Sequence, residues 1–459
     1  MGMAAAKPPS YTSEMSTPLK VEQPESTRAG DMFGSQSSAT KSAASQWNAR
    51  PEVQLLLGCA RTTVDKSTAE RIRTLLSESI DWQYTIEQAS QHRIIPLLWQ
   101  SLNETCPKRV PAEVLKRLRQ HSSSSAHYNL YRTGELIKLL RLFDLNGIAA
   151  LPFKGPVLAL AAYGNLGLRD YGDLDILVRP RDVLKTKRIL IGCGYRLVTQ
   201  PGRHKEPRFS QRNKDLIFDS RDGRVRVELH WRLTGRHFDF PLDLNSLWAR
   251  PETISLAGSV VRTLAPEDLL LYLCMHGSRH GWERLLWICD VAELLRTHSR
   301  MDWELLARKA QRLGSRRTLA LGLILARDLL GMELPKDVWR KVQVEPDAES
   351  LALHLQKSLF QNEEGDRGIS YWHDIHLRMR ERSSDRLRLR WHYLRRYLRL
   401  ALVPNERDHA MLELPPALPF LYYLLRPFRL IRTFGIQELK KRTVRGRQED
   451  NHVLPSRPR

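Results

Sequence analysis

Two acidic side chains stand two residues apart at the start of an apolar run, Gly172-Asp173-Leu174-Asp175-Ile176-Leu177-Val178. A run this rich in branched apolar residues predicts a β-strand, whose side chains alternate between its two faces. Asp173 and Asp175 are therefore expected on one face, and Leu174, Ile176 and Val178 on the other face, which packs in a core. Two carboxylates this close repel each other unless a cation joins them, and their hard oxygen ligands suit Mg²⁺.

A second segment, Val227-Glu228-Leu229-His230-Trp231, alternates in the same way and places Glu228 and His230 on one face together with Arg226. If the two strands are neighbours, Glu228 brings a third carboxylate to the acidic pair. Carboxylates that hold two divalent ions can activate a hydroxyl and bind a triphosphate, so the pattern indicates phosphoryl or nucleotidyl transfer. Glu228 is also a candidate general base. The alternative is a solvated strand face that carries no chemistry.

Basic residues near the acidic strand are candidates for contacts with phosphate. Arg169 suits bidentate recognition of a phosphate, and Lys154 offers a point charge. Gly155 follows Lys154 and precedes Pro156, which fits the first turn of a helix. His230 is expected either to touch substrate or a phosphate, or to support the groups that do.

The elements that must position these residues follow from hydrophobic spacing, which predicts helices before and after a central group of strands. The expected strands cover 148–153, 173–178, 195–199, 216–219 and 224–233, with Asp222-Gly223 as a hairpin turn. Helices are expected over 135–145, 156–163, 182–191, 267–276, 285–295, 303–313, 318–330 and 385–402. The fold class is therefore α+β, a small mixed β-sheet flanked by N- and C-terminal helical regions.

Composition divides the chain into six segments. Residues 1–48 are rich in Ser, Thr, Ala and Pro and are expected to be disordered. The expected order is then a helical region over 49–146, a catalytic core over 147–264, a helical region over 265–345, a basic helical region over 346–438 and a disordered tail over 439–459.

The formal net charge of +22 favours polyanionic partners such as nucleotides, nucleic acid, phosphorylated glycans or an acidic membrane face. Five cysteines without close spacing argue against a disulfide framework or a zinc ribbon, and fit a reducing cytosol. The sequence shows neither a secretory signal nor the roughly 18 uninterrupted apolar residues of a membrane span. We expect a cytoplasmic protein, with the apolar and arginine-bearing segment 412–434 as a candidate for peripheral contact with the inner membrane face.

Two further patterns carry weaker hypotheses. His276 and His280 share a helix face at the spacing of a zinc motif, but Gly277 stands where a catalytic Glu would be. We instead expect His276 and Asp290 to fix the helical region against the nucleotide site. Arginines and aromatic residues alternate over 385–402, a combination that can bind single-stranded nucleic acid, although no motif supports sequence-specific binding.

An ordered set of motifs goes beyond these generic patterns: Lys154-Gly155, Tyr163, Arg169, the Asp173 strand, Gly194-Tyr195 and Glu228-Leu229-His230-Trp231. It is preceded by Asp81-Trp82 and Ala89 and followed by His276, Trp282, Asp290 and Trp303. With these residues the sequence resembles the uncharacterised nucleotidyltransferase family of bacteria, a branch of the polymerase-β-like nucleotidyltransferase superfamily. The resemblance covers about residues 51–335.

The resemblance implies that Asp173, Asp175 and Glu228 bind two Mg²⁺ ions, for which Mn²⁺ can substitute. The implied reaction moves a nucleoside monophosphate from NTP to an acceptor and releases pyrophosphate. The acceptor is open: a small molecule, a glycan intermediate, a peptide or a protein. The sequence departs from the superfamily at Lys154-Gly155-Pro156, where a Gly-Ser or Gly-Gly pair normally grips the triphosphate. The alternatives are therefore an inactive protein of this fold that binds nucleotide or a partner, and a basic membrane or nucleic-acid adaptor.

Overall fold

The computed structural model describes residues 50–198, 214–233, 244–342, 345–360, 369–403, 422, 423 and 426. The two segments expected to be disordered, 1–48 and 439–459, lie outside the described residues, as does most of 412–434. The chain forms two units, Met1–Ser383 and Ser384–Arg459, which are described separately.

A five-stranded mixed sheet lies within the first unit, in the strand order β1-β2-β5-β4-β3. Strand β2 pairs parallel to β5 and antiparallel to β1, while β4 pairs antiparallel to both β5 and β3. The strands are β1 (Ala150–Pro152), β2 (Asp173–Val178), β3 (Arg196–Leu197), β4 (Asp215–Asp219) and β5 (Arg226–His230). The expected α+β class with a small mixed sheet is confirmed.

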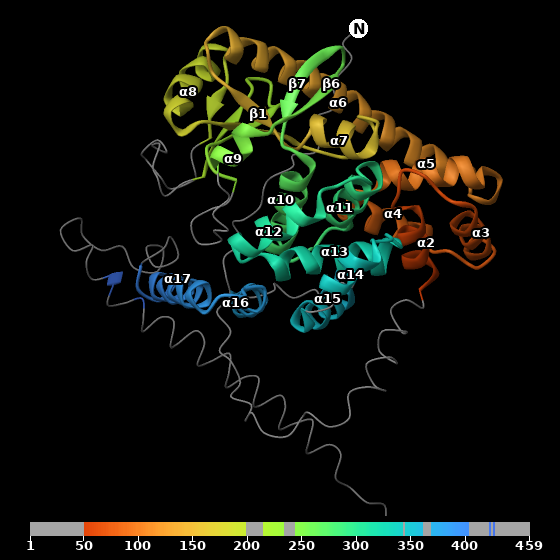
Figure 1. Ribbon diagram of the computed structural model, residues 1–459. Helices are drawn as coiled ribbons and strands as arrows, with labels where there is room; N and C mark the ends of the chain where they lie inside the picture. The colour runs from red at the N-terminus through yellow and green to blue at the C-terminus, as the bar shows by residue number, and fades with distance from the viewer. Residues whose placement is uncertain are drawn as a thin grey trace, which may run out of the picture. The chain divides into compact units, whose positions relative to one another are not determined.

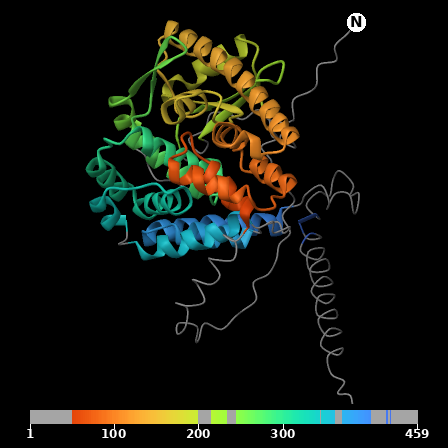
Figure 2. The same ribbon diagram turned by 90° about the vertical axis from the view of Figure 1, so that its right-hand side faces the viewer.

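Alternation along the strands gives the sheet two different faces. Leu174, Ile176 and Val178 of β2 join Val227 and Leu229 of β5 in one buried apolar cluster. Figures 1 and 2 show the long helix α6 (Ala112–Leu145) beside the strands, and its C-terminal half packs into this cluster. The polar side chains of the two strands therefore share the other face of the sheet.

Along the chain, helices precede and follow the strands of the sheet, as Figure 1 shows. Before the sheet lie α2 (Pro51–Cys59), α3 (Lys66–Leu75), α4 (Trp82–Gln91), α5 (Ile95–Thr105), the short η1 (Pro107–Arg109) and α6. Between its strands lie α7 (Pro156–Tyr163), η2 (Pro180–Asp182) and α8 (Val183–Gly192), and α9 (Leu244–Ala249) follows. The later helices are α10 (Pro266–Arg279), α11 (Leu285–Thr297), α12 (Trp303–Leu313), α13 (Arg316–Leu330), α14 (Lys336–Val342), α15 (Pro346–Leu359) and α16 (Ile369–Arg378).

The sequence pattern did not indicate one β-hairpin, formed by β6 (Glu252–Leu256) and β7 (Ser259–Thr263). Its two turn residues, Ala257 and Gly258, have φ values of 47° and 77°. Such turns usually carry Asn-Gly or Asp-Gly, because most other residues disfavour positive φ. An Ala in that position gives no recognisable hairpin signal.

The second unit contains α17 (Ser383–Leu402), a helix with six arginines. Five large apolar side chains are exposed along it: Leu387, Trp391, Leu394, Leu398 and Leu402. Among the described residues, the helices are all too short or too polar to cross a membrane.

Candidate active site

The parallel pairing of β2 with β5 creates the candidate site. Asp175 stands directly opposite Glu228, and Leu177 opposite His230. Because side chains alternate on both strands, Asp175, Glu228 and His230 lie on the same face of the sheet. The predicted meeting of these two segments is therefore present in the structure.

Three side chains form a compact polar group at this point. Ligand atoms of Asp175, Glu228 and His230 all lie within 4.8 Å of one another. His230 Nε2 lies 3.1 Å from Asp175 Oδ1 and 3.4 Å from Glu228 Oε2. Burial and the Lys214 ammonium lower the pKa of His230, but hydrogen bonds to the two carboxylates outweigh them and raise it overall. The imidazole is thus held as a donor between the two acids.

Lys154, in the loop between β1 and α7, supplies a positive charge opposite the acidic group. Its Nζ lies 3.3 Å from Asp175 Oδ2, and both side chains are largely buried. Burial alone would lower the pKa of Lys154, yet Asp175 and its neighbours raise it above the ordinary value. Burial would likewise raise the pKa of Asp175, but Lys154 and His230 hold it below the ordinary value. Both groups are therefore charged in the fold.

Gly155 allows this loop to pass close to β2. Its φ of 58° lies in the left-handed region, and it sits immediately before the first residue of α7. A Cβ at this position would lie 3.0 Å from the carbonyl oxygen of Asp173. Only glycine fits here without strain, and the result is that Lys154 reaches Asp175.

Asp173 lies at the edge of the site rather than in the three-residue group. It stands opposite Arg226 in the register of β2 and β5. Burial raises its pKa, and the charges of Asp175 and Glu228 raise it further, against the opposing effect of Lys154. The electrostatic coupling places Asp173 near the other acids, and its role as a metal ligand stays a prediction.

Asp215, the first residue of β4, and the neighbouring Lys214 form a second charged pair beside His230. Asp215 Oδ2 lies 3.9 Å from His230 Nδ1 and is also paired with Lys214. Burial raises the pKa of Asp215, but His230 and Lys214 together lower it below the ordinary value. An ionised Asp215 on the Nδ1 side favours the orientation in which Nε2 faces Asp175 and Glu228.

The residues present fit a divalent cation. Asp175 and Glu228 offer carboxylate oxygens, and Asp175 Oδ2 is buried with no hydrogen bond besides its ion pair with Lys154. Carboxylates suit Mg²⁺ or Mn²⁺, whereas the imidazole of His230 also suits softer transition metals. The donor set supports a metal site and leaves the identity of the metal open.

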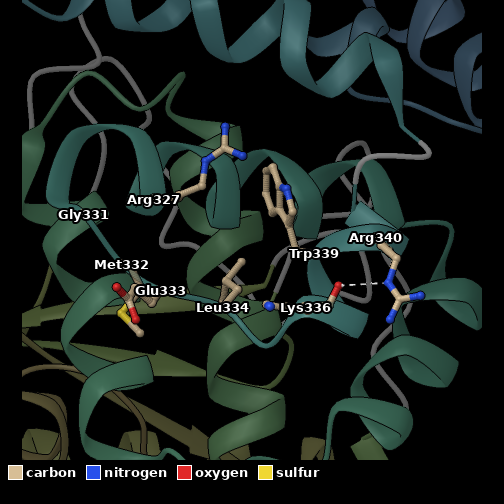
Figure 3. A pocket seen from close by; sticks show the side chains of 8 residues that line it. All are labelled: Arg327, Gly331, Met332, Glu333, Leu334, Lys336, Trp339 and Arg340. Carbon is tan, nitrogen blue, oxygen red and sulfur yellow. Dashed lines mark hydrogen bonds between the residues drawn. The ribbon is translucent and has the colours of Figure 1, made fainter.

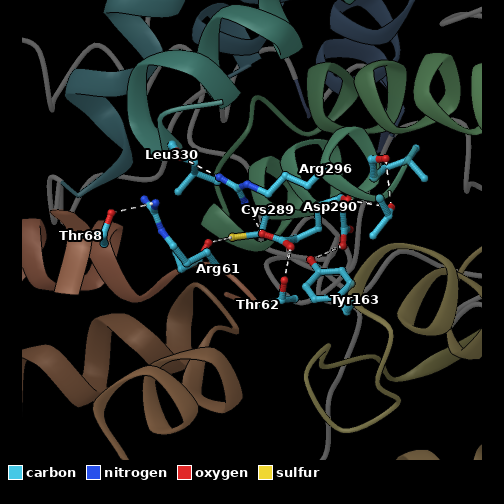
Figure 4. A network of polar contacts seen from close by, with 12 residues as sticks. Arg61, Thr62, Thr68, Tyr163, Cys289, Asp290, Arg296 and Leu330 are labelled. Atoms are coloured by element: carbon cyan, nitrogen blue, oxygen red, sulfur yellow. Dashed lines mark hydrogen bonds and ion pairs between the residues drawn. The ribbon is translucent and has the colours of Figure 1, made fainter. Parts of the chain in front are cut away.

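Arg169, a predicted phosphate contact, is bound to another helix. Its Nε and one terminal nitrogen donate to the two carboxylate oxygens of Asp290 on α11, at 2.7 and 2.9 Å, and Tyr163 donates to Asp290 at 2.7 Å. Figure 4 labels Tyr163 and Asp290 of this buried group. The predicted role of Asp290 in fixing the helical region agrees with this contact. Contact between Arg169 and phosphate remains a prediction that the pairing disfavours.

The same helix also ties the N-terminal helices to this region. One turn after Asp290, the buried Glu293 accepts a hydrogen bond of 2.6 Å from Thr62 and is paired with Arg296. Thr62 and Arg296, a residue of α11, are both labelled in Figure 4. Helix α11 therefore links α7 of the core with the loop after α2.

Sequence reasoning missed two arginines beside the site, Arg93 and Arg284. The loop between α4 and α5 caps α11: the Leu285 amide donates to His92 Nδ1 at 3.2 Å and the Leu286 amide to the His92 carbonyl at 3.3 Å. Arg93, next to His92, has the rare φ of 56°. Its charge partly opposes the rise in the pKa of Asp173, and it adds to the burial that lowers the pKa of Arg284. No local pattern marks these residues, because they meet only through the contact of the loop after α4 with the start of α11.

A separate hollow of about 660 Å³ lies at the junction of α13 and α14, as Figure 3 shows. Arg327 covers the ring of Trp339 there, with its Cζ 3.7 Å from the ring centroid. None of the predicted site residues lines it. The lining residues are Arg327, Gly331, Met332, Glu333, Leu334, Lys336, Trp339 and Arg340.

Comparison with known proteins identifies a family for most of the described core. Residues 78–331 match a family described as uncharacterised nucleotidyltransferase. No curated protein matches the chain. Among solved structures, an antigenic nucleotidyltransferase-like protein from Paracoccidioides brasiliensis is 16% identical over 50% of this chain and 92% of that one, with a TM-score of 0.28. The family match spans more than half of the 459 residues and includes every candidate site residue. The chain therefore belongs to the uncharacterised nucleotidyltransferase family.

Proposed function

We propose that the protein transfers a nucleoside monophosphate from an NTP to an acceptor with the help of Mg²⁺, and releases pyrophosphate. The observation that carries this proposal is the parallel register of β2 and β5, which sets Asp175 opposite Glu228 with His230 beside them. Family membership supplies the class of reaction.

Asp175 and Glu228 would hold the metal, with Asp173 at the edge of the site as a further ligand. The bound cation would supply charge stabilisation for the triphosphate and lower the pKa of the attacking hydroxyl. Lys154 would balance the charge of Asp175 and contact phosphate from the loop before α7. His230 would orient the two carboxylates, and Glu228 is the candidate base for the proton of the acceptor hydroxyl.

The acceptor is a small molecule, a glycan intermediate, a peptide or a protein side chain, in each case one that offers a nucleophilic group. The core over 147–264 would carry the chemistry, and the helical region over 265–345 would form the wall beside it. We place the protein in the cytoplasm, where NTP is available.

A transfer assay with labelled NTPs, Mg²⁺ and candidate acceptors tests the proposal. Asp175→Asn and Glu228→Gln are expected to lower the rate of pyrophosphate release by at least about a hundredfold, since each removes a ligand charge. Asp144→Asn, an exposed acid on α6, serves as the matched control and should keep the full rate. If both site variants release pyrophosphate as fast as the wild type, the assigned site is wrong.

The Lys154-Gly155-Pro156 element favours a second candidate function, binding of nucleotide without transfer. In the superfamily, a glycine-rich element at this position grips the triphosphate. Here the position holds Lys154, which is already paired with Asp175. Calorimetry separates the two functions. A binding protein would take up ATP with a measurable heat and release no pyrophosphate with any acceptor.

The exposed surface of α17 supports peripheral contact with an anionic membrane. Its five exposed apolar residues follow one another at spacings of three or four, so they form one stripe. The flanking arginines are Arg386, Arg388, Arg390, Arg395, Arg396 and Arg399. A basic helix with such a stripe can lie in the interface of an anionic bilayer.

Flotation with vesicles tests this contact. Binding to phosphatidylglycerol vesicles is expected at physiological salt, with little binding to phosphatidylcholine vesicles. Trp391→Ser with Leu398→Ser should abolish it, while Val260→Ser, an exposed apolar residue on β7, should not. Equal binding by all variants, or preference for single-stranded DNA over vesicles, would overturn the membrane assignment.

A further inference from the structure

Aromatic and imidazole side chains line one side of α10 next to the acidic site. Tyr272, His276 and His280 follow at intervals of four residues, so they share one helix face. Trp287 of α11 closes the row. Its ring centroid lies 5.4 Å from that of His276 and 5.2 Å from that of His280, and the two imidazoles are 4.8 Å apart.

Ring contacts connect this row to Lys154 and His230 of the acidic site. Lys154 Nζ lies 5.8 Å from the centroid of Tyr272, whose ring in turn stacks on His276 at 5.9 Å. Phe153 contacts both Tyr272, at 4.9 Å, and His230, at 5.2 Å. The row therefore begins beside Lys154, which pairs with Asp175, and leads away from the acidic site along α10.

The far end of the row is less deeply buried than its start. Tyr272 is buried, whereas His276, His280 and Trp287 are each only partly covered. Among the hydrogen bonds of the described residues, none involves either imidazole ring. Packing in a core accounts for Tyr272, but it does not account for a cluster of flat rings with unused polar atoms beside a catalytic group.

The electrostatics of the row favour a neutral, flat ligand group. Burial, and then the charge of Lys154 or Arg279, lowers the pKa of His276 and His280 well below the ordinary value. Both imidazoles are therefore uncharged near neutral pH, and each offers one donor and one acceptor. Such groups do not attract phosphate, but they can stack on a heterocycle and hydrogen-bond to its edge.

We propose that His276, His280 and Trp287 bind the nucleobase of the NTP, with the triphosphate directed towards Lys154 and the acidic site. This inference rests on the proposed function, because it assumes that the site takes an NTP. Stacking on aromatic rings tolerates every base, and hydrogen bonds from the two imidazoles would add preference among bases.

Calorimetric binding of two ligands, ATP and inorganic tripolyphosphate, each with Mg²⁺, tests the assignment. Trp287→Leu is expected to weaken ATP binding by about tenfold or more, the loss of one base stack, and to leave tripolyphosphate binding unchanged. Trp287→Phe keeps a flat ring and should retain most of the affinity for ATP. Trp303→Leu, at the start of α12, is the matched control and should bind both ligands as the wild type does.

His280→Ala provides a second variant if Trp287→Leu does not fold, and it too should weaken ATP selectively. Equal losses for ATP and tripolyphosphate, or no loss for either, would overturn the base site while the proposed function stands. Selective loss of ATP binding in a protein that releases no pyrophosphate would support the base site and reject the transfer reaction. A wild-type protein that binds neither ligand would reject both.

Discussion

Lys154 Nζ lies 3.3 Å from Asp175 Oδ2, and this buried pair joins the loop before α7 to the strand that carries the acidic motif. The same carboxylate oxygen has no hydrogen-bond partner. A divalent cation bound to Asp175 would therefore share the negative charge of this carboxylate with Lys154. We therefore predict that metal binding and the stability of the core are coupled at this oxygen.

Lys154→Met is expected to destabilise the metal-free protein by about 3–5 kcal/mol, because it leaves the Asp175 carboxylate buried without its counter-charge. Mg²⁺ should restore part of this loss, since it supplies the missing positive charge. Urea unfolding with and without Mg²⁺ measures both effects. Lys138→Met, an exposed lysine paired with Glu135, should change stability by less than about 1 kcal/mol. A Lys154 variant as stable as this control would contradict the coupling.

Gly155→Ala is expected to reduce both stability and transfer. The added Cβ meets the Asp173 carbonyl oxygen at 3.0 Å, and φ of 58° disfavours alanine. A loss of at least about 1 kcal/mol should result. Gly134→Ala provides the contrast, because a Cβ there meets nothing within 4 Å and the residue lies inside α6. It should stabilise the protein by about 0.5–1 kcal/mol. Thermal unfolding compares the two, and shifts of the same sign would count against this explanation.

The pair Arg169–Asp290 can be separated from catalysis by substitution of both partners. Asp290→Leu alone should cost about 3–5 kcal/mol, because it leaves the Arg169 guanidinium buried and unpaired. Adding Arg169→Met should recover much of that stability. Denaturant unfolding gives the coupling between the two residues, and the transfer assay gives the rate.

If the double variant regains both stability and transfer, Arg169 acts only through Asp290 and its predicted contact with phosphate is wrong. Recovery of stability without recovery of transfer would instead support that contact. The structure leads us to expect the first outcome, since two of the guanidinium donors already bind Asp290.

His92 makes part of the stability depend on pH. Burial and the charge of Arg284 lower its pKa from 6.5 to about 4, so the folded protein prefers the neutral ring. The folded-state pKa lies below the unfolded one, and the stabilisation is therefore complete above pH 6.5 and is lost as the pH falls towards 4. The loss is about 3 kcal/mol.

His92→Asn keeps an acceptor for the Leu285 amide and removes the titration. Free energies of unfolding measured from pH 7 to pH 4 should fall less steeply in the variant than in the wild type. Parallel curves would show that His92 does not titrate in this range.

Local pattern alone was sufficient for much of the sheet. The strand at Asp173–Val178, the helix at Pro156–Tyr163 and the hairpin around Asp222-Gly223 were all predicted, because alternation and turn residues act over a few positions. The hairpin β6–β7 was not, since its turn carries Ala257 at positive φ instead of a favoured turn residue.

The candidate site shows the same division. The sequence by itself determined that Asp173 and Asp175 share one face of a strand, and that Glu228 and His230 share one face of another, because side-chain alternation is a property of the extended backbone. Only the tertiary structure decided that these faces meet, that His230 lies within the group of three while Asp173 lies at its edge, and that Arg169 binds Asp290. Those choices depend on contacts between residues more than fifty positions apart, and the packing of whole helices and strands, rather than any local pattern, selects them.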